Sequence, residues 1–482
     1  MGQALTWLAE QQPDAVAVSD DERTLTRAEL DRAANRLARV YAEQGVRQDD
    51  LMMLVLPNGV DLLVASAAAW KVGAVPTPVS VRMPVPERSD VVAVAQPRLV
   101  VGAEPQDHPG TPTVGGDLAA LSAGRSAEPL PPKAAGCWKA VLSGGSTGTP
   151  KVVLSTTPAT IDPTGPPSVY IPAGGTQLVA GPMFHAASFT YATRGMLTGQ
   201  RLVVLPRFDP ARVLEEIARH RVTFAAFVPT MLRRILQLPA ETRAAADLSS
   251  LVEVLHVGAR CPEWLKREWI AWIGPERLLE VYGGSEALGV ATIRGDEWLA
   301  HPGSVGRPLG DSEFRIVGPD GADVPVGEVG EILARRTSGA STYRYLGAPS
   351  RWRDDGWDAS GDLGRLDAGG YLYVLDRVDD MIITGGANVF PAEVEGVLDG
   401  HPGVRTSVAF GLSDPDLGQR VHAVVELADP AVTPAELLGW AGERLDREKV
   451  PRAVEIVDGP LRNEAGKVRR KLLRAEREVT AG

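Results

Sequence analysis

The stretch LSGGSTGTPKVV, residues 142–153, places three glycines, four hydroxyl side chains and one lysine between apolar residues. Glycines let the backbone approach a phosphate closely, and hydroxyls and a lysine supply donors and positive charge. A Walker A loop would run straight from Gly-Lys into a helix. Here Pro150 precedes Lys151, and the β-branched residues that follow favour a strand. The stretch therefore predicts a strand, a glycine loop and another strand, which can either wrap a polyphosphate or form a plain hairpin turn.

The bulk composition is that of an ordinary soluble protein. The chain has 482 residues, 44% hydrophobic and 23% charged, a length that predicts at least two domains. Its net charge of -11 argues against a nucleic-acid surface. Cys137 and Cys261 are its only cysteines, its opening residues do not predict a secretory signal, and it has no run of about 18 apolar residues. These features predict a cytoplasmic protein without a membrane span.

Helical and strand-like patterns alternate over much of the chain. Residues 25–45 and 60–72 have apolar residues at helical spacing, and short apolar strands such as LMMLVLP and LVVLP lie between such segments. Helix and strand also alternate from Arg212 to Gly284, which favours parallel strands joined by crossovers. Residues 104–136 are rich in Pro, Gly, Ala and Ser and predict a long loop. The expected fold class is α/β.

The last third of the chain has a different pattern. Residues 310–376 are dominated by strand-like segments, and a smaller set of elements follows the pair Asp379 and Asp380. That set comprises a helix near 391–399, strands near 405–427, a helix near 433–445, a strand near 453–457 and a basic terminal helix. We expect a boundary at the aspartate pair, which gives domains 1–378 and 379–482.

Four ordered motifs carry a family resemblance. LSGGSTGTPK, VYGGSE (281–286), SGDLGRLDAGGYLYVLDRVDDMIITGGANVFPAEVE (360–395) and LRNEAGKVRRKLL (461–473) together resemble the core motifs of the ANL superfamily. This superfamily contains acyl-CoA synthetases, peptide-synthetase adenylation domains and firefly-type luciferases. The resemblance spans nearly the whole chain and is greatest to acyl-CoA ligases of the bile-acid type. It implies a large N-terminal domain with layered sheets and a small mobile α+β C-terminal domain.

The resemblance also implies a reaction. A carboxylate attacks the α-phosphorus of ATP to give an acyl adenylate and pyrophosphate, and the thiol of coenzyme A then displaces AMP. A carboxylate is a poor electrophile, so it must first gain a good leaving group. Positive groups and Mg²⁺ must neutralise the negative charge that gathers on the phosphate oxygens in the transition state. ATP, Mg²⁺ and coenzyme A are therefore the expected cofactor and cosubstrates.

The same resemblance assigns roles to individual residues. Glu286 would hold Mg²⁺, and Lys467 would bridge the acid and the nucleotide during adenylation. Tyr282 would stack near adenine, Ser285 would touch the α-phosphate, and Asp362 and Arg377 would bind the ribose. The remaining nucleotide-binding residues would be Ser143, Gly144, Gly145, Ser146, Thr147, Gly148, Lys151, Gly258, Ala259 and Gly283.

Further residues are implied for substrate binding and for motion. Asp379 matches the hinge about which the C-terminal domain swings between two poses. Gly385 and Gly386 would form walls of the pantetheine tunnel. His185 in PMFHAASF lies where the family keeps a residue at the acyl pocket, and it is expected to act with Lys467 and Glu286 in catalysis. Each of these charged or aromatic residues could alone be structural.

Two departures from the family pattern leave alternatives open. Val152 replaces a glycine after the loop lysine, and Ser285 replaces a threonine before Glu286. An enzyme that only converts a preformed acyl adenylate to the thioester is one alternative, and a non-catalytic adenylate-binding protein is another. No carrier domain follows, which disfavours a peptide-synthetase module, and nothing supports a luciferase.

The acyl group is the least defined part of the sequence-based hypothesis. Small residues in GPMFHAASF, FAAF and HVGAR suggest a roomy apolar pocket. Together with the bile-acid-type resemblance they suggest a bulky hydrophobic acid, such as a terpenoid or steroid acid of secondary metabolism. The sequence does not fix an oligomeric state, a homodimer being one option.

Overall fold

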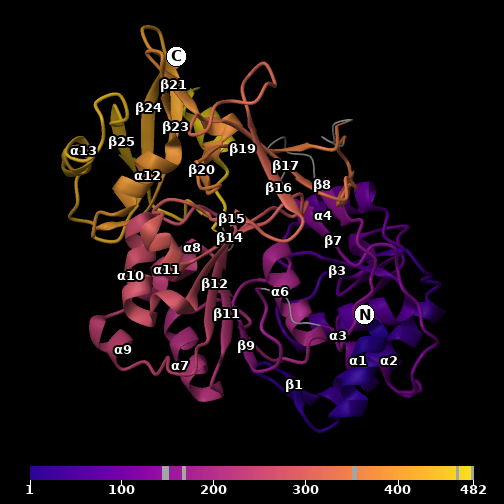
Figure 1. Cartoon of the computed structure of the whole chain (residues 1–482). Coiled ribbons are helices and arrows are strands. Elements are labelled where there is room, and N and C mark those ends of the chain that lie inside the picture. The colour runs from indigo at the N-terminus through magenta and orange to yellow at the C-terminus, as the bar shows by residue number, and fades with distance from the viewer. Residues whose placement is uncertain (144–150, 166–169, 350–354, 463–465, 479–482) are drawn as a thin grey trace. The chain divides into compact units, whose positions relative to one another are not determined.

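The computed structural model describes residues 1–143, 151–165, 170–349, 355–462 and 466–478 (Figure 1). They form two compact units. The first unit contains Met1–Gly258, Ile273–Leu288 and Ser338–Trp352, and the second contains Ala259–Trp272, Gly289–Thr337 and Arg353–Gly482. Both combine helices with sheets, so the predicted α/β class is confirmed.

The first unit is built on three sheets. In its largest sheet the parallel strands β13, β12, β11, β9, β10 and β1 lie in that order, and β2 pairs antiparallel with β1. The strands of this sheet are β1 (Val16–Ser19), β2 (Thr24–Thr26), β9 (Thr176–Val179), β10 (Arg201–Val204), β11 (Phe224–Phe227), β12 (Glu253–Val257) and β13 (Leu278–Tyr282). Figure 1 shows α6 (Ala186–Leu197) and α7 (Pro210–His220) on either side of it. The predicted alternation of helices and parallel strands is therefore confirmed.

The other two sheets of this unit are smaller. The parallel sheet contains β4 (Val75–Pro78), β3 (Leu51–Leu54), β5 (Leu99–Val101) and β6 (Thr113–Val114), in that order. The antiparallel sheet contains β18 (Tyr343–Leu346), β8 (Lys151–Ser155) and β7 (Ala140–Ser143). The remaining helices of the unit are α1 (Gly2–Gln11), α2 (Arg27–Glu43), α3 (Val60–Val72), α4 (Val85–Ala95), α5 (Leu118–Ser122), α8 (Pro229–Leu236) and α9 (Ala240–Ala244).

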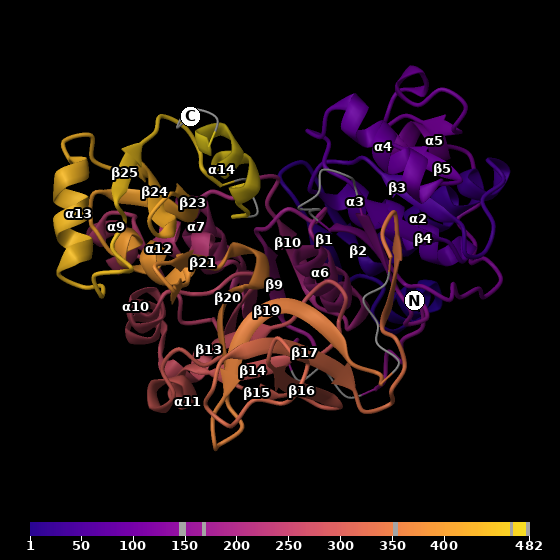
Figure 2. The ribbon, with the colours of Figure 1, turned by 90° about the horizontal axis from the view of Figure 1, so that it is seen from above.

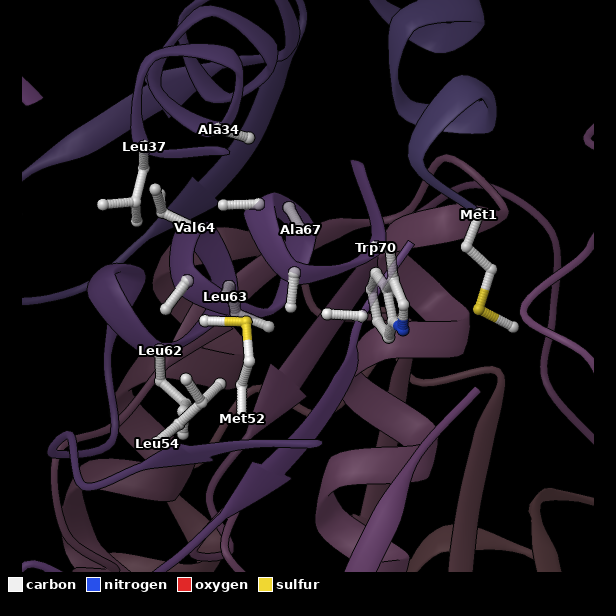
Figure 3. Packing of buried hydrophobic residues seen from close by; sticks show 14 of the residues in the cluster. Met1, Ala34, Leu37, Met52, Leu54, Leu62, Leu63, Val64, Ala67 and Trp70 are labelled. Carbon is white, nitrogen blue, oxygen red and sulfur yellow. The ribbon is translucent and has the colours of Figure 1, made fainter. Parts of the chain in front are cut away.

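Helices α2 and α3 form much of the core of the first unit. Thr26 and Glu29 form a capping box at the start of α2, which satisfies two backbone donors there. Every residue of helix α3 except Asp61 is buried, as its mostly apolar sequence requires. Figure 3 shows Leu37 of α2 near Val64 of α3, and Trp70 farther along the same helix. Both helices were predicted from their sequence pattern.

The expected loop 104–136 is wrong in part. This stretch contains β6 and α5, together with a short 3-10 helix (Pro105–Asp107). Strand β6 exists because it pairs with β5, and α5 begins where the carboxylate of Asp117 accepts a hydrogen bond from the amide of Ala120. Such short elements depend on pairing and capping rather than on periodicity, so the composition of the stretch did not indicate them.

The second unit contains two larger sheets. Figure 2 shows the antiparallel sheet of β16 (Ser312–Val317), β17 (Gly330–Arg336), β19 (Asp358–Leu366) and β20 (Leu372–Arg377). The other sheet orders β22 (Ala387–Val389), β21 (Ile382–Thr384), β24 (Gly418–Leu427) and β23 (Val404–Asp414), with β25 (Ala453–Ile456) on β24. The unit also holds a pair of strands, β14 (Ala291–Arg294) and β15 (Arg307–Pro308), and the helices α10 (Glu263–Ile273, its last residue in the first unit), α11 (Gly295–Ala300), α12 (Pro391–Asp399), α13 (Pro434–Gly442) and α14 (Arg470–Glu478).

The part of the second unit that follows Asp380 has its own core. Its buried residues come from α12, α13 and the strands β21 to β25, with Val394, Leu398 and Leu437 fully buried. The order of helices and strands agrees with the order predicted for residues 391–478. Among the described residues, no helix is long and apolar enough to cross a membrane.

Candidate active site

The glycine stretch joins two antiparallel strands. Ser143 at the end of β7 faces Lys151 at the start of β8, and Leu142 faces Val152. Lys151 begins a strand and not a helix, so the two predicted strands are confirmed and a Walker A arrangement is excluded. The loop residues themselves lie outside the described part of the chain, including Gly144, Gly145, Ser146, Thr147 and Gly148.

Lys151 and Glu286 come together, as the sequence-based roles require. The Nζ atom of Lys151 lies 3.9 Å from Oε1 of Glu286, and both side chains are about one-fifth exposed, at 19% and 20%. The phenol of Tyr345 donates a hydrogen bond of 2.7 Å to the same carboxylate oxygen. The Nζ atom of Lys151 also lies 3.9 Å from the centre of the Tyr345 ring, within cation–π range. One tyrosine on β18 therefore contacts both charged groups.

The backbone around Glu286 is also held in place. The hydroxyl of Thr342 donates a 2.6 Å hydrogen bond to the Glu286 carbonyl. Ala287 has φ of 53°, a left-handed conformation that a residue with a Cβ adopts only at a cost of about 1 kcal/mol. A Cβ on Gly284 would lie 3.1 Å from Oε2 of Glu286, so a side chain there would crowd the carboxylate. The bond from Thr342 holds the backbone of Glu286, and the glycine at 284 leaves room for its carboxylate.

The donor set of this region suits Mg²⁺ bound together with a phosphate ligand. No group of three or more His, Cys, Asp or Glu side chains that could hold a metal is found within the described residues. Mg²⁺ commonly uses one or two carboxylates, with water and substrate phosphates as its other ligands. Glu286 is partly exposed, and the bond from Tyr345 goes to Oε1 rather than Oε2. It therefore fits the role of a single protein carboxylate for the ion.

Two more predicted residues lie at adjacent strand ends. Strands β12 and β13 are parallel, with Val257 beside Val281, so Gly258 and Tyr282 follow at the same carboxyl edge. Ligands of open α/β sheets bind at this edge. Gly258 has φ of 90°, which explains the glycine there. Gly283 and Ser285 continue the chain from Tyr282 toward Glu286, and Ala259 is the first residue of the second unit.

The two predicted ribose-binding residues face each other in the second unit. Asp362 on β19 pairs with Arg377 on β20, and their side chains form an ion pair of 3.0 Å between Oδ1 and Nε. The Arg377 guanidinium also donates to the carbonyl of Ser360 at 3.1 Å. Asp362 is 9% exposed, so its carboxylate is held in a defined orientation.

The segment around the predicted hinge is tied to the last helix. Asp379 lies in a short 3-10 helix, Val378–Asp380, and forms an exposed ion pair of 3.1 Å with Lys471. The next residue, Asp380, forms an ion pair with Arg470, whose guanidinium also contacts Glu395 at 2.5 Å. Helix α14 is therefore joined to the predicted hinge through two adjacent basic residues.

Lys467 lies just before α14 and is exposed. The guanidinium of Arg462 donates to the carbonyl of Gly466 at 3.3 Å and binds Glu395 at 3.2 Å. Gly466 has φ of 74°, a conformation that favours glycine. Arg462 therefore links Gly466, the residue before Lys467, to Glu395.

Gly385 and Gly386 form the turn between β21 and β22. Their φ angles of 56° and 85° are those of a type I′ hairpin turn. Gly385 also lines a cavity of about 270 Å³ within the second unit. The other lining residues are Thr384, Ala387, Leu417, Val421, Glu448, Val450 and Arg452. A contact with pantetheine stays a prediction for this turn.

His185 is the residue that precedes α6. Its ring lies 4.3 Å from that of Phe184, and its carbonyl accepts the first helical hydrogen bond from Phe189 at 3.0 Å. The position gives His185 a structural part in starting the helix. Its expected contact with an acyl group stays a prediction.

Four residues near these sites were missed by the sequence analysis: Thr342, Tyr345, Gly284 and Lys139. Tyr345 contacts Glu286 only because β18 pairs with β8, with Tyr345 beside Val153. This pairing joins segments almost 200 residues apart, and no periodic pattern encodes it. Gly284 was inside a quoted motif, so its place beside Glu286 could have been found there.

Comparison with known proteins identifies the family. Residues 5–344 match the model of the AMP-binding enzyme family, and residues 393–467 match the AMP-binding enzyme C-terminal domain. A feruloyl-CoA synthase from Amycolatopsis sp. is 35% identical over 95% of both chains. The long-chain-fatty-acid–CoA ligase FadD13 of Mycobacterium tuberculosis is 30% identical over 96% of this chain and 95% of its own.

Solved structures agree with this result. The O-succinylbenzoate coenzyme A synthetase of Bacillus subtilis, in complex with ATP and magnesium ion, superposes with a TM-score of 0.81 at 27% identity over 98% of both chains. Another structure of that synthetase contains its acyl-adenylate intermediate. The names of these relatives do not support the narrower resemblance to bile-acid-type ligases. The chain belongs to the AMP-binding enzyme family, the AMP-forming acid–thiol ligases of the ANL superfamily.

Proposed function

We propose that the protein is an acyl-CoA ligase that uses ATP, Mg²⁺ and coenzyme A. In the first step, a carboxylate oxygen of the acid bonds to the α-phosphorus of ATP and pyrophosphate leaves. In the second step, the sulfur of coenzyme A bonds to the acyl carbon, AMP leaves, and the thiol proton is released. The arrangement of Lys151, Tyr345 and Glu286 at the end of the glycine hairpin is the observation that carries this proposal.

The charges at that hairpin suit the first step. Lys151 supplies positive charge next to the glycine loop, and Glu286 is fixed by the bond from Tyr345. When bound, Mg²⁺ would neutralise negative charge on the phosphate oxygens, and Glu286 is the carboxylate that would hold it. Preorganised groups of this kind stabilise a transition state because they need not reorient during the reaction.

The chain would work as two parts, residues 1–378 and 379–482. We propose that the second part turns about Asp379 between the two half-reactions. Its ion pair with Lys471 is exposed and therefore weak, so it would oppose such a turn little. Lys467 would bind the acid and the nucleotide in the first pose only, and Gly385 and Gly386 would contact pantetheine in the second.

The proposed substrate is a bulky acid with a large apolar body, such as a terpenoid or steroid acid of secondary metabolism. Small residues after β9 and in β11 support room for such a body, including Ala186, Ala187, Ala225 and Ala226. A panel of purified acids tests this choice. Better turnover of acetate or short straight acids than of steroid or diterpene acids would contradict it.

Two assays on the full chain test the activity itself. The first measures exchange of labelled pyrophosphate into ATP that depends on added acid. The second measures thioester formation from a synthetic acyl adenylate and coenzyme A. We expect the wild type to perform both. Lys467→Ala should abolish the exchange and spare much of the second reaction, whereas the exposed control Lys133→Ala should leave both unchanged.

The assays also separate the alternatives. Thioester formation without exchange would identify an enzyme that only uses a preformed acyl adenylate, and neither activity would leave an adenylate-binding protein. Val152, one reason for these alternatives, is fully buried and faces Leu142 and Leu346 in the sheet. Its side chain fills the core, which supports a packing role for this residue.

A further inference from the structure

Two cations share one tryptophan ring in the first unit. Lys139 directly precedes β7, and its Nζ atom lies 4.7 Å from the centre of the Trp138 ring. The guanidinium carbon of Arg194, in α6, lies 4.9 Å from the centre of the same ring. Lys139 is 9% exposed and Trp138 is 4% exposed, and Arg194 is half-buried. Two positive side chains thus contact one ring, and one of them is buried.

Within the described part of the chain, neither cation forms an ion pair with an acidic residue. Among the residues that the structure describes, no carboxylate lies within 4.0 Å of Lys139 or of Arg194. Instead Lys139 donates a 2.5 Å hydrogen bond to the hydroxyl of Thr190, which in turn donates to the carbonyl of Ala186. A buried cation without a counter-charge is costly, so a pair of them indicates that an anion completes the arrangement.

The pKa values of Lys139 and Arg194 are consistent with a bound anion. Burial, and then repulsion by Arg194, lower the pKa of the Lys139 ammonium to about 7, while Cys137 and Glu286 act in the opposite direction. Burial also lowers the pKa of Arg194, and Tyr170 raises it. A bound carboxylate would offset both the desolvation and the mutual repulsion.

The geometry suits a carboxylate. Thr190 and Arg194 are four residues apart on α6, so they share one face of the helix, and Lys139 reaches that face through Thr190. An ammonium and a guanidinium together offer several hydrogen-bond donors to two carboxylate oxygens, while the Thr190 hydroxyl orients the ammonium. This face begins one turn after His185, the residue expected to contact the acyl group. The negative charge of Glu286 raises the pKa of Lys139, so the two side chains interact electrostatically.

We propose that Lys139 and Arg194 bind a second carboxylate of the acid that the enzyme activates, remote from the carboxylate that is adenylated. The preferred substrate class is therefore a diacid with an apolar body, rather than a simple monoacid. This inference rests on the proposed function and refines its substrate class.

The test compares two acids with the same apolar body, one with and one without a second carboxylate at the far end. The wild type should activate the diacid with a kcat/KM about 10- to 100-fold above that of the monoacid, the range expected for a charge-assisted contact. Lys139→Met and Arg194→Met should each lose most of this preference while activating the monoacid within about threefold of wild type. The exposed controls Lys133→Met and Arg207→Met should keep it.

A binding measurement accompanies the kinetics. Titration of both acids without ATP, followed by calorimetry, should show tighter binding of the diacid to the wild type and equal binding of the two acids to Lys139→Met. This readout does not depend on turnover, so it decides the inference even if no acid supports exchange and the proposed function fails. Folding of each variant is checked by its melting temperature.

Three results would overturn the inference. One is an unchanged preference in both folded methionine variants, and another is a wild type that binds the two acids equally. The third is a higher KM for ATP in the variants with no change for the diacid, because it would assign the cations to nucleotide phosphates instead.

Discussion

Removal of one oxygen atom from Tyr345 tests the arrangement around Glu286. In Tyr345→Phe the ring stays under Lys151, but the 2.7 Å hydrogen bond to Oε1 of Glu286 is lost. A hydrogen bond to a charged group contributes about 1.5–3 kcal/mol. If that bond orients the carboxylate in the transition state, kcat/KM should fall roughly 10- to 150-fold, at about 1.4 kcal/mol per tenfold.

The chain offers a matched control for this change. Tyr371 donates a hydrogen bond of the same length, 2.7 Å, to Oε1 of Glu297, and neither residue belongs to the candidate site. Both Tyr→Phe variants lose the same kind of bond, so both should lose stability to a similar degree. Only Tyr345→Phe should slow acid-dependent pyrophosphate exchange and need more Mg²⁺ for half-maximal rate. A folded Tyr345→Phe variant whose rate of pyrophosphate exchange stays within twofold of the wild-type rate at all Mg²⁺ concentrations would refute the reasoning.

Three further changes have defined outcomes. Arg470→Met removes the ion pair of Asp380 and one of the two ion pairs of Glu395, which keeps Arg462, and should destabilise α12 and α14 by about 3 kcal/mol in hydrogen exchange. Lys471→Met, which breaks an exposed pair, should cost less than about 1 kcal/mol, and equal effects would contradict the ion-pair assignment. Gly284→Ala should lower kcat/KM roughly three- to tenfold at an unchanged melting temperature, because its Cβ would push the Glu286 carboxylate, and full activity would show that the carboxylate tolerates displacement. The pKa of Lys139 is about 7 in the folded state, below its value in the unfolded chain, so the free energy of unfolding rises with pH between these two values. Lys139→Met should therefore raise the melting temperature more at pH 6 than at pH 9. The same rise in melting temperature at both pH values would contradict the lowered pKa.

Much of the fold could be predicted because its signals are local. Helices α2 and α3 follow from their periodicity and from the Thr26 cap, and the strand after Lys151 follows from its β-branched residues. The short strand β6 and helix α5 could not be predicted in the same way, since they depend on contacts with distant segments. The boundary of the mobile part stays a prediction from the motif around Asp379.

In the candidate site, too, residues within local motifs could be predicted and residues placed by distant strand pairing could not. Motifs indicated Lys151, Glu286, Asp362 and Arg377, and the structure pairs Lys151 with Glu286 in the first unit and Asp362 with Arg377 in the second. The motifs gave no indication of Tyr345, because its role arises from the pairing of β18 with β8. Lys139 could not be identified for another reason. A lysine before a strand is common, and only the structure shows that this one is buried.

Acid-dependent exchange of labelled pyrophosphate into ATP by the full wild-type chain tests the central claim most directly. The account predicts exchange with Mg²⁺ present and a suitable acid added, and none when either is left out. A purified, folded chain that binds ATP, shows no exchange with any acid of a broad panel, and forms no thioester from acyl adenylates would contradict it.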